Sequence, residues 1–219
     1  MNIITSFFKH QSAHYWSRYK WLEDWKKEIL DNIKNPKIVD LGAGHRPMWD
    51  ATHLVEMYID DNTQRARSFK AGSRVVINSN IEKIPVENKT FDLSYARHVL
   101  EHVDDPEKAC KEIMRVSRQG FIETPHPFLE IGYGFPKKER GWSFHKWYVW
   151  TDNTNTLFFR RKTEKNINDF CDCLYGAYAY QIFDHYKPDL NQYLNKMPYW
   201  LKNTKFIWRD KFKFKIIDK

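Results

Sequence analysis

The sequence has no long apolar run. None of its 219 residues falls in a stretch that approaches the roughly 18 apolar residues that a membrane-spanning helix requires. The apolar segment at residues 3–8 is followed directly by Lys9 and His10, which leaves it too short for the core of a signal peptide. These absences exclude helical membrane insertion and predict that the chain stays in the cytoplasm.

Cysteine is also scarce. The chain has three, Cys110, Cys171 and Cys173, an odd number without the spacing of a metal-binding motif. A scaffold held by disulfides and a zinc site built from cysteine are therefore both excluded, and a reducing compartment is favoured.

Tryptophan is missing from residues 50–141, although the chain has nine. Both ends are rich in aromatic residues and lysine, whereas the middle alternates short apolar runs with amphipathic stretches. A chain of this length fits one domain with its own core. We therefore expect a single domain over residues 1–219, in which a helical cap at 1–35 and a C-terminal segment at 125–219 flank a core at 36–124.

Charge and apolar content describe a globular protein with a basic surface. Lysine and arginine number 36 against 28 acidic residues, a net charge of +8, and 42% of residues are hydrophobic. This composition excludes a disordered chain. The charge leaves RNA open as a partner, with the basic aromatic stretch at residues 208–215 as its binding segment; the same stretch also fits an edge strand protected by lysines.

Residue periodicity predicts an α/β fold. Apolar residues three and four apart predict an amphipathic helix over residues 12–34, stopped by Pro36. Short apolar runs predict strands at residues 37–41, 54–59, 74–77, 91–96 and 120–124, with a helix at 106–118. Alternation of this kind predicts a doubly wound, mostly parallel sheet with helices on both faces and ligands beyond the carboxyl ends of its strands.

The pattern changes after residue 124. Residues 145–151 and 156–161 flank the polar stretch 152–155 and predict an antiparallel C-terminal hairpin. Helical texture follows to about residue 194, and residues 205–217 alternate like one edge strand.

Four motifs in the middle of the chain resemble one enzyme family. Residues 38–44 read Ile-Val-Asp-Leu-Gly-Ala-Gly, and longer matches follow at residues 80–93, 98–106 and 112–116. Together they resemble class I S-adenosylmethionine-dependent methyltransferases, in particular the type 11 methyltransferase domain, over residues 37–124. The resemblance implies a Rossmann-like fold, S-adenosyl-L-methionine as cofactor and S-adenosyl-L-homocysteine as product.

The resemblance also implies where the cofactor binds. Glycines after the first strand let the backbone approach the cofactor, and an acid after the second strand, here Asp60 with Asp61 as a substitute, binds the ribose hydroxyls. Asn80 stands where the family usually has an aspartate for the adenine. The implied cofactor residues are Asp40, Gly42, Ala43, Gly44, Asp60, Asp61, Asn80, Ile81, Tyr95 and Ala96.

Two departures from common patterns matter. Asn80 keeps an acceptor oxygen but loses the charge, and Arg46-Pro47 replace the third glycine of a dinucleotide fingerprint, which counts against NAD. The same departures are the expected symptoms of an alternative, a catalytically inactive methyltransferase fold that serves as a binding module.

Histidines are the candidate bases. A hydroxyl acceptor needs help to lose its proton. His126, between two prolines just after the fifth strand, is the first candidate, and His145, in an aromatic segment, is the second. In the alternative interpretation His126 only turns the chain and His145 packs in an aromatic patch.

Aromatic and polar residues around these histidines predict the acceptor. The segments at 123–125 and 141–147 resemble proteins associated with glycan methylation, which implies O-methylation of a sugar or glycan hydroxyl. Another small molecule or RNA remains an alternative, and the oligomeric state stays open. The expected acceptor residues are His98, Glu123, Trp142 and Trp147.

Metal binding is not favoured by the sequence. Glu123, Glu130, His126 and His145 have the chemistry for a divalent cation such as Mg²⁺ or Mn²⁺, but no spacing that demands one. His98 and His102 are four apart, as in a zinc pair, yet the family pattern carries a histidine here without metal, so His102 is interpreted as structural.

Overall fold

The computed structural model describes residues 19–63, 67–127, 130, 144–152, 154–163 and 202–217. The chain divides into two compact units, Met1–Pro36 and Lys37–Lys219, and each is described by itself. No helix among these residues is long and apolar enough to cross a membrane.

The first unit contains helix α2, Lys20–Leu30. It confirms the predicted amphipathic helix within residues 20–30, but it ends at Leu30, with Asp31 as its C-cap, several residues before Pro36. An ion pair of 2.7 Å between Lys26 Nζ and Glu23 Oε1 links successive turns. Residues 12–18 of the predicted helix lie outside the described part of the chain.

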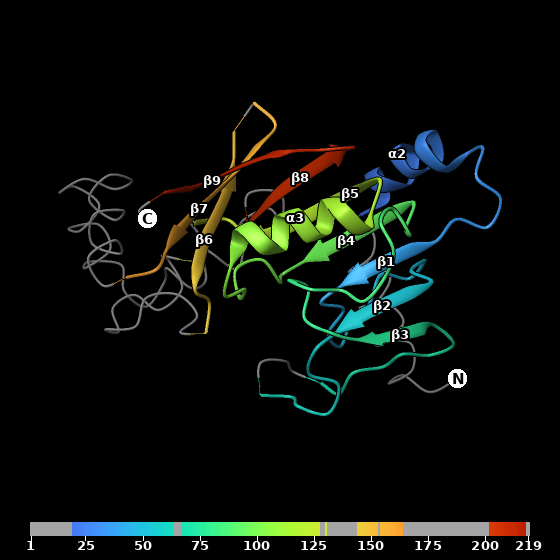
Figure 1. Cartoon of the computed structure of the whole chain (residues 1–219), viewed down its shortest axis with the longest axis horizontal. Helices are drawn as coiled ribbons and strands as arrows, with labels where there is room; N and C mark the ends of the chain where they lie inside the picture. The colour runs from blue at the N-terminus through green and yellow to red at the C-terminus, as the bar shows by residue number, and fades with distance from the viewer. Residues whose placement is uncertain are drawn as a thin grey trace, which may run out of the picture. The chain divides into compact units, whose positions relative to one another are not determined.

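The second unit is built on a six-stranded sheet with the order β3-β2-β1-β4-β5-β8 (Figure 1). The first five strands are parallel, and β8 pairs with β5 in the antiparallel sense. This topology confirms the predicted doubly wound sheet. The strands are β1 (Ile38–Leu41), β2 (His53–Glu56), β3 (Val75–Asn78), β4 (Leu93–Arg97), β5 (Gln119–Pro125) and β8 (Asn203–Arg209).

Fewer helices connect the parallel strands than we expected. Among the described residues, only the link from β4 to β5 forms a helix, α3 (Pro106–Val116). The link from β1 to β2 turns instead, because Pro47 cannot donate a backbone hydrogen bond and the Met48 amide donates to Asp40 Oδ2 at 2.7 Å. This part of the cofactor-side edge therefore consists of loops.

Helix α3 is well specified by its first residues. Asp105 is its N-cap, and the Asp105 carboxylate accepts hydrogen bonds from the amides of Glu107 and Lys108 at 3.0 and 3.1 Å. Pro106 occupies the first turn, where a missing amide proton costs nothing. One face of the helix, which carries Ala109, Cys110, Ile113 and Val116, is buried.

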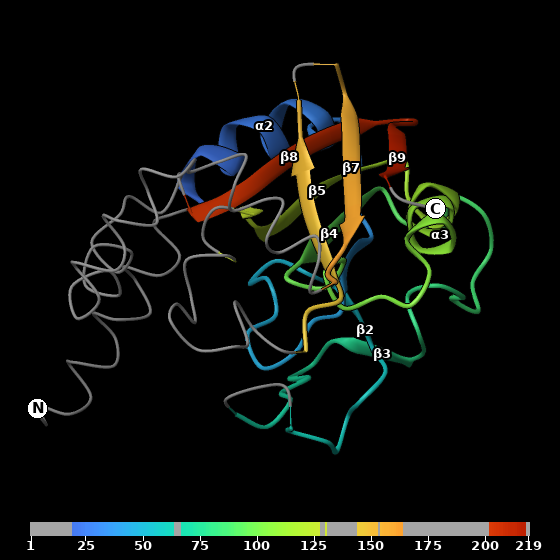
Figure 2. The ribbon, with the colours of Figure 1, turned by 90° about the vertical axis from the view of Figure 1, so that its left-hand side faces the viewer.

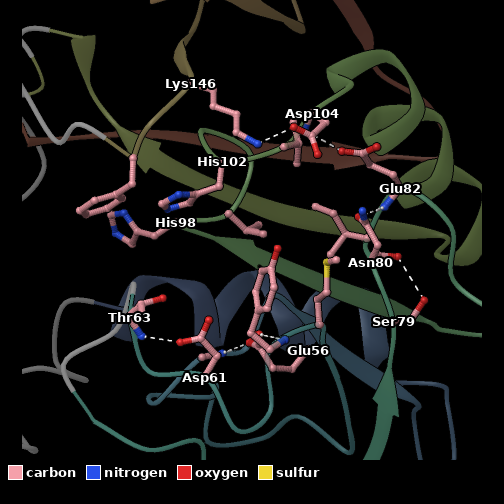
Figure 3. Close-up of a pocket in the computed structure, with 18 residues that line it drawn as sticks. Glu56, Asp61, Thr63, Ser79, Asn80, Glu82, His98, His102, Asp104 and Lys146 are labelled. Carbon is pink, nitrogen blue, oxygen red and sulfur yellow. Dashed lines mark hydrogen bonds and ion pairs between the residues drawn. The ribbon is translucent and has the colours of Figure 1, made fainter.

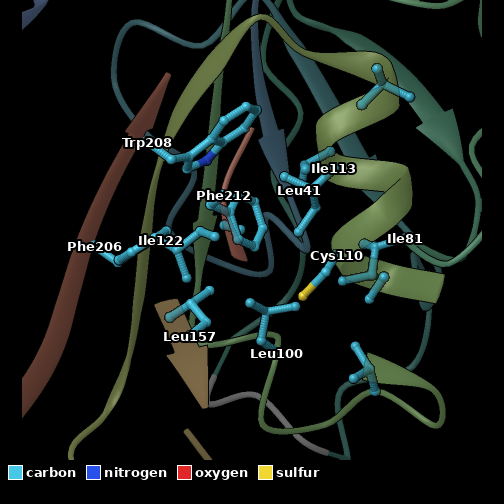
Figure 4. Close-up of a cluster of buried hydrophobic side chains, with 14 of the residues drawn as sticks. Leu41, Ile81, Leu100, Cys110, Ile113, Ile122, Leu157, Phe206, Trp208 and Phe212 are labelled. Atoms are coloured by element: carbon cyan, nitrogen blue, oxygen red, sulfur yellow. The ribbon is translucent and has the colours of Figure 1, made fainter. Parts of the chain in front are cut away.

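The core lies between α3 and the sheet and continues under the C-terminal strands (Figure 4). Gly120 of β5 is where strand and core come closest, because a Cβ there would lie 2.7 Å from the Ser94 carbonyl and 2.7 Å from Trp208 Nε1. Strand β8 contributes Phe206 and Trp208 to this core although it lies far along the chain from the other members, so β8 is an integral part of the core. Its labelled members are Leu41, Ile81, Leu100, Cys110, Ile113, Ile122, Leu157, Phe206, Trp208 and Phe212.

A second sheet has the order β6-β7-β9 (Figure 2). Strands β6 (Trp147–Thr151) and β7 (Thr156–Arg161) confirm the predicted antiparallel hairpin. Strand β9 (Lys213–Ile217) pairs with β7 in parallel.

The prediction of one edge strand over residues 205–217 is therefore wrong. Strands β8 and β9 belong to different sheets, and Asp210 turns the chain between them with a φ of 60°. Trp208 and Phe212 on either side of this turn are both buried in the same core, so the alternation of apolar residues continues across the break. Periodicity alone cannot show such a turn.

The N-cap of α3 gives a test of the fold. Replacing Asp105 with Ala removes the acceptor of two helix amides and is expected to lower the free energy of unfolding by about 1 kcal/mol at pH 7. The amide of Lys108, then its side chain, holds the pKa of Asp105 below its usual value, so this stabilisation is present above an unfolded-state pKa of about 3.9 and is lost as the pH falls through the lower folded-state value. Denaturant titrations at several pH values measure it.

The matched control for this test is Asp105→Asn. Asparagine caps helices about as well as aspartate but does not titrate, so its stability should stay near wild type at pH 7. Equal losses for the Ala and Asn variants would contradict the capping role.

Candidate functional site

A pocket opens at the carboxyl ends of the parallel strands. Strand β1 lies between β2 and β4, so the chain leaves the sheet centre in opposite directions here, and α/β proteins place ligands at such a point. The pocket has a volume of about 320 Å³, and Figure 3 shows side chains from several strand ends converging on it. It is lined by Gly42, Gly44, Glu56, Met57, Tyr58, Asp61, Thr63, Ser79, Asn80, Ile81, Glu82, His98, Val99, His102, Val103, Asp104, Phe144 and Lys146.

The turn after β1 requires glycine at Gly42. This residue has a φ of 67°, its amide donates to the Val55 carbonyl at 2.8 Å, and a Cβ would lie 2.4 Å from Cγ2 of Val99. Gly44 has a φ of 57°, and its amide donates to Glu56 Oε2 at 2.8 Å. The turn is thus tied to the end of β2 and leaves backbone at the pocket wall.

The acid at the end of the second strand is Glu56. Strand β2 ends at this residue rather than at residue 59, so the expectation that Asp60 closes the strand is wrong: Asp60 is exposed and is not one of the residues lining the pocket. Glu56 is 8% exposed and also accepts from the Tyr58 amide at 3.0 Å. Asp61, the predicted substitute, does line the pocket.

Asn80 and Ile81 line the pocket as predicted, just after β3. Asn80 Oδ1 accepts the Glu82 amide at 2.9 Å, which fixes the side chain at the start of a turn. Glu82 Oε1 in turn accepts the amides of Asp104 and Asp105 at 2.7 and 3.1 Å. This loop therefore connects the pocket to the start of α3.

Four residues implied for the cofactor are buried behind the pocket, three of them in strands β1 and β4 and one, Ala43, in the turn after β1. Arg97 Nη2 lies 3.7 Å from Asp40 Oδ2, and burial raises the pKa of Asp40 against the effect of that guanidinium. The Tyr95 hydroxyl donates to Asp50 Oδ2 at 3.1 Å. The four are buried and absent from the pocket lining: Asp40, Ala43, Tyr95 and Ala96.

His98 is held between two carboxylates. Its Nδ1 lies 3.5 Å from Glu101 Oε1, its Nε2 lies 3.6 Å from Glu123 Oε1, and its amide donates to the Glu123 carbonyl at 2.7 Å. Burial disfavours the charged ring, but the two carboxylates outweigh it and raise the pKa of His98 to about 10. His98 is thus an imidazolium at neutral pH. Of the predicted acceptor residues, it lines the pocket, whereas Glu123 lies buried behind it.

His102 and His145 meet beside His98. His102 lines the pocket, so its interpretation as purely structural was too narrow (Figure 3). Its ring centroid lies 4.6 Å from that of His145 and 5.6 Å from that of Phe144. His145 is buried, and its Nδ1 lies 2.8 Å from Glu130 Oε2. Burial lowers the pKa of His102.

The other predicted residues lie elsewhere. His126 is half-buried, its amide donates to the Lys202 carbonyl at 2.8 Å, and it is not part of the pocket lining. Trp147 is buried, and its Nε1 donates to the Val103 carbonyl at 2.8 Å, so it packs in the core. Trp142 lies outside the described residues.

The structure groups a different set of metal-binding side chains from the one suggested by sequence. Among the described residues, ligand atoms of Glu101, His102 and His145 all lie within 4.8 Å of one another. The set from sequence analysis combined His145 with residues on other segments. Glu101 went unnoticed because its neighbours in sequence match the family motif so closely.

The pocket residues that sequence reasoning missed include Glu56, Phe144 and Lys146. Glu56 lay inside a strand predicted to be too long, and Phe144 and Lys146 lay in an aromatic segment from which other residues were chosen. Lys146 Nζ pairs with Asp104 Oδ1 at 2.5 Å, and both residues line the pocket (Figure 3). The acid directly after the apolar pair Leu54-Val55 is the signal that could have identified Glu56.

Comparisons with known proteins agree with this geometry. Residues 40–122 match a family described as a methyltransferase domain. No protein of curated function matches the sequence. Solved structures that resemble the chain include an S-adenosylmethionine-dependent methyltransferase from Thermotoga maritima, with 18% identity, 53% of this chain and 57% of that chain covered, and a TM-score of 0.33.

Two other solved structures show a similar degree of likeness. An S-adenosylmethionine-dependent methyltransferase from Listeria monocytogenes has 16% identity, coverage of 65% of this chain and 63% of its own, and a TM-score of 0.39. A protein from Pyrococcus horikoshii has 19% identity, coverage of 74% and 81%, and a TM-score of 0.41. The chain thus spans little more than half of the Thermotoga protein. Residues 40–122 are thus similar to a methyltransferase domain, and the strand order of the sheet is Rossmann-like.

Proposed function

We propose that this chain transfers a methyl group from S-adenosylmethionine to a hydroxyl of a sugar or glycan. The observation that carries the cofactor half is the convergence of Gly42, Gly44, Glu56 and Asn80, from three successive strand ends, on one pocket of about 320 Å³. The family match over residues 40–122 supports the same cofactor.

Each of these groups has a role toward the cofactor. The backbone of the glycine turn lets the ligand approach closely because no Cβ intervenes. The Glu56 carboxylate, held by two backbone amides, is placed to accept hydrogen bonds from the ribose hydroxyls. The Asn80 amide serves the adenine edge without the charge of the usual aspartate. When bound, S-adenosylmethionine supplies an electrophilic methyl group on a sulfonium.

The opposite wall suits a polar, uncharged acceptor. His98, His102, Phe144 and Lys146 line it, and Phe144 is 39% exposed. An exposed aromatic ring stacks on the apolar face of a sugar, while the imidazoles beside it are hydrogen-bonding partners for hydroxyls. These side chains support a sugar acceptor.

Removal of the acceptor proton falls to a histidine. His145 lies beside the pocket-lining His102 and is oriented by Glu130, as a base is oriented by a carboxylate. The acceptor O–H bond breaks and its proton passes to the imidazole of His145; the oxygen then bonds to the methyl carbon, and the carbon–sulfur electron pair goes to sulfur. His126 is the second candidate, held at the end of β5.

The charge of the pocket favours this acceptor over RNA. Glu56, Asp61, Glu82 and Asp104 all line it, and Lys146 is paired with Asp104. Phosphates would meet carboxylates here, so the net charge of +8 must be carried by other surfaces. Another uncharged small molecule is the nearest alternative. A catalytically inactive binding module would use the same pocket without turnover.

Cofactor binding is tested by replacing each of the two candidate acids with its amide. Glu56→Gln removes the charge that receives the ribose hydroxyls and is expected to weaken S-adenosylmethionine binding about tenfold or more, a loss of about 1.4 kcal/mol or greater. Asp60→Asn is the matched control, because Asp60 is exposed and outside the pocket. Isothermal titration calorimetry measures both. A larger loss for Asp60→Asn would restore Asp60 as the ribose ligand and refute the role given to Glu56.

Acceptor chemistry is tested with the two histidines. His145→Ala is expected to lower methyl transfer about 10²-fold or more, as removal of a general base does, with cofactor affinity nearly unchanged. His126→Ala should have a smaller effect: neither histidine lines the pocket, but the His145 ring packs against the pocket-lining His102. The assay is mass spectrometry of a panel of methyl glycosides incubated with isotopically labelled S-adenosylmethionine, and circular dichroism checks that each variant folds. Full activity in His145→Ala with loss in His126→Ala would reverse the assignment.

A further inference from the structure

We infer that Glu101, His102 and His145 form a binding site for a zinc-type divalent cation in the wall of the pocket. The three residues come from the segment after β4 and from the segment that leads into β6. One ligand atom of each lies within 4.8 Å of the others. Metal–ligand bonds of about 2.0–2.2 Å bring such atoms slightly closer together, which small side-chain rotations can achieve.

The first argument is the state of the Glu101 carboxylate. Glu101 is 2% exposed, and neither of its oxygens accepts a hydrogen bond within the described part of the chain. The imidazole nitrogens nearest to Oε1 are His98 Nδ1 at 3.5 Å and His102 Nε2 at 3.9 Å, which are too far for strong hydrogen bonds. The charged His98 ring offsets the charge of Glu101 from 3.5 Å, but it leaves both buried carboxylate oxygens without a hydrogen bond. A directly bound cation would supply the contact that these oxygens lack.

The second argument concerns the two imidazoles. His102 Nδ1 is also buried without a hydrogen-bond partner among the described residues. His145 is oriented through Nδ1 by Glu130 at 2.8 Å, and Glu130 is in turn paired with Lys162 at 2.5 Å. A histidine whose one nitrogen contacts a carboxylate is the usual form of a metal-bound histidine, because the carboxylate fixes the ring for its other nitrogen. The site thus has its outer contacts in place.

The donor set selects the kind of metal. Two imidazoles and one carboxylate suit Zn²⁺ and its neighbours in the first transition row, whereas Mg²⁺ prefers oxygen ligands throughout. Three protein ligands are also typical of catalytic zinc sites, which keep a further position for water or substrate. The His102 side chain is 24% exposed and lines the pocket. Water or substrate would therefore reach the open coordination position from the pocket, past His102.

A cation here gives His145 its part in the proposed reaction. This step rests on the proposed function: a zinc-type cation lowers the pKa of a bound hydroxyl, so the acceptor O–H bond breaks with its proton passing to water and its electron pair staying on oxygen. That oxygen then takes the methyl group, and the carbon–sulfur pair goes to sulfur. With the cation bound, His145 would thus be a metal ligand and not the base that takes the proton, and His145→Ala lowers methyl transfer in either case.

Cobalt binding to the untagged full chain tests the site. After removal of metals with EDTA and dialysis, Co²⁺ is expected to bind one per chain, give visible d–d absorption bands and raise the melting temperature. His102→Gln should weaken Co²⁺ binding about 100-fold or more and is tolerated by the fold because the side chain is partly exposed. Glu130→Gln should weaken it about 10- to 100-fold.

The matched control is His53→Gln. His53 lies at the amino end of β2, away from the pocket, so its loss removes one imidazole without touching the cluster. Absence of Co²⁺ bands in the wild-type chain, or equal affinity in the His102 and His53 variants, would overturn the inference and leave Glu101 paired with His98 alone. S-adenosylmethionine calorimetry on the same samples separates the two proposals, because it reports the cofactor pocket independently of the cation.

Discussion

The contact between Gly42 and Val99 is the constraint on which the site depends. The end of β1 approaches the segment after β4 so closely that a Cβ at Gly42 would overlap Val99. This approach sets the floor of the pocket, and the bond from the Gly44 amide to Glu56 then ties the end of β2 to the same point. The backbone of the glycine turn, the acid and the residues after β4 face one another because these two contacts fix the three strand ends.

Charge is distributed unevenly around this floor. The chain carries a net charge of +8, yet the pocket gathers carboxylates on the β2 and β3 side and imidazoles on the β4 side. In the proposed reaction this division would separate two tasks: the acidic side would receive the hydroxyls and the amine of a nucleoside, and the imidazole side would contact the acceptor. The buried carboxylates Glu101 and Glu123 keep His98 charged, which places a fixed positive charge at the junction of the two sides.

Sequence reasoning succeeded where local pattern and structure coincide. The strands β1 to β5, helix α3 and the hairpin of β6 and β7 follow from apolar runs, capping residues and polar turns, and two motifs supplied Gly42, Gly44, Asn80 and Ile81, which line the pocket. Sequence reasoning failed where tertiary contacts decide. Strand β2 ends at Glu56, short of Asp60 and of the end of its apolar run, and β8 and β9 separate at a turn that their alternation conceals. No local signal shows that Glu101, His102 and His145 converge, since residues distant in sequence create that cluster.

The central claim is that the pocket at the glycine turn receives the adenosyl group of S-adenosylmethionine. A crystal structure of the full chain with S-adenosyl-L-homocysteine tests it most directly. The account predicts the ribose hydroxyls within hydrogen-bond distance of the Glu56 carboxylate and the adenine beside Asn80 and Ile81. A nucleoside bound away from the glycine turn, or a pocket that stays empty at saturating ligand, would contradict it.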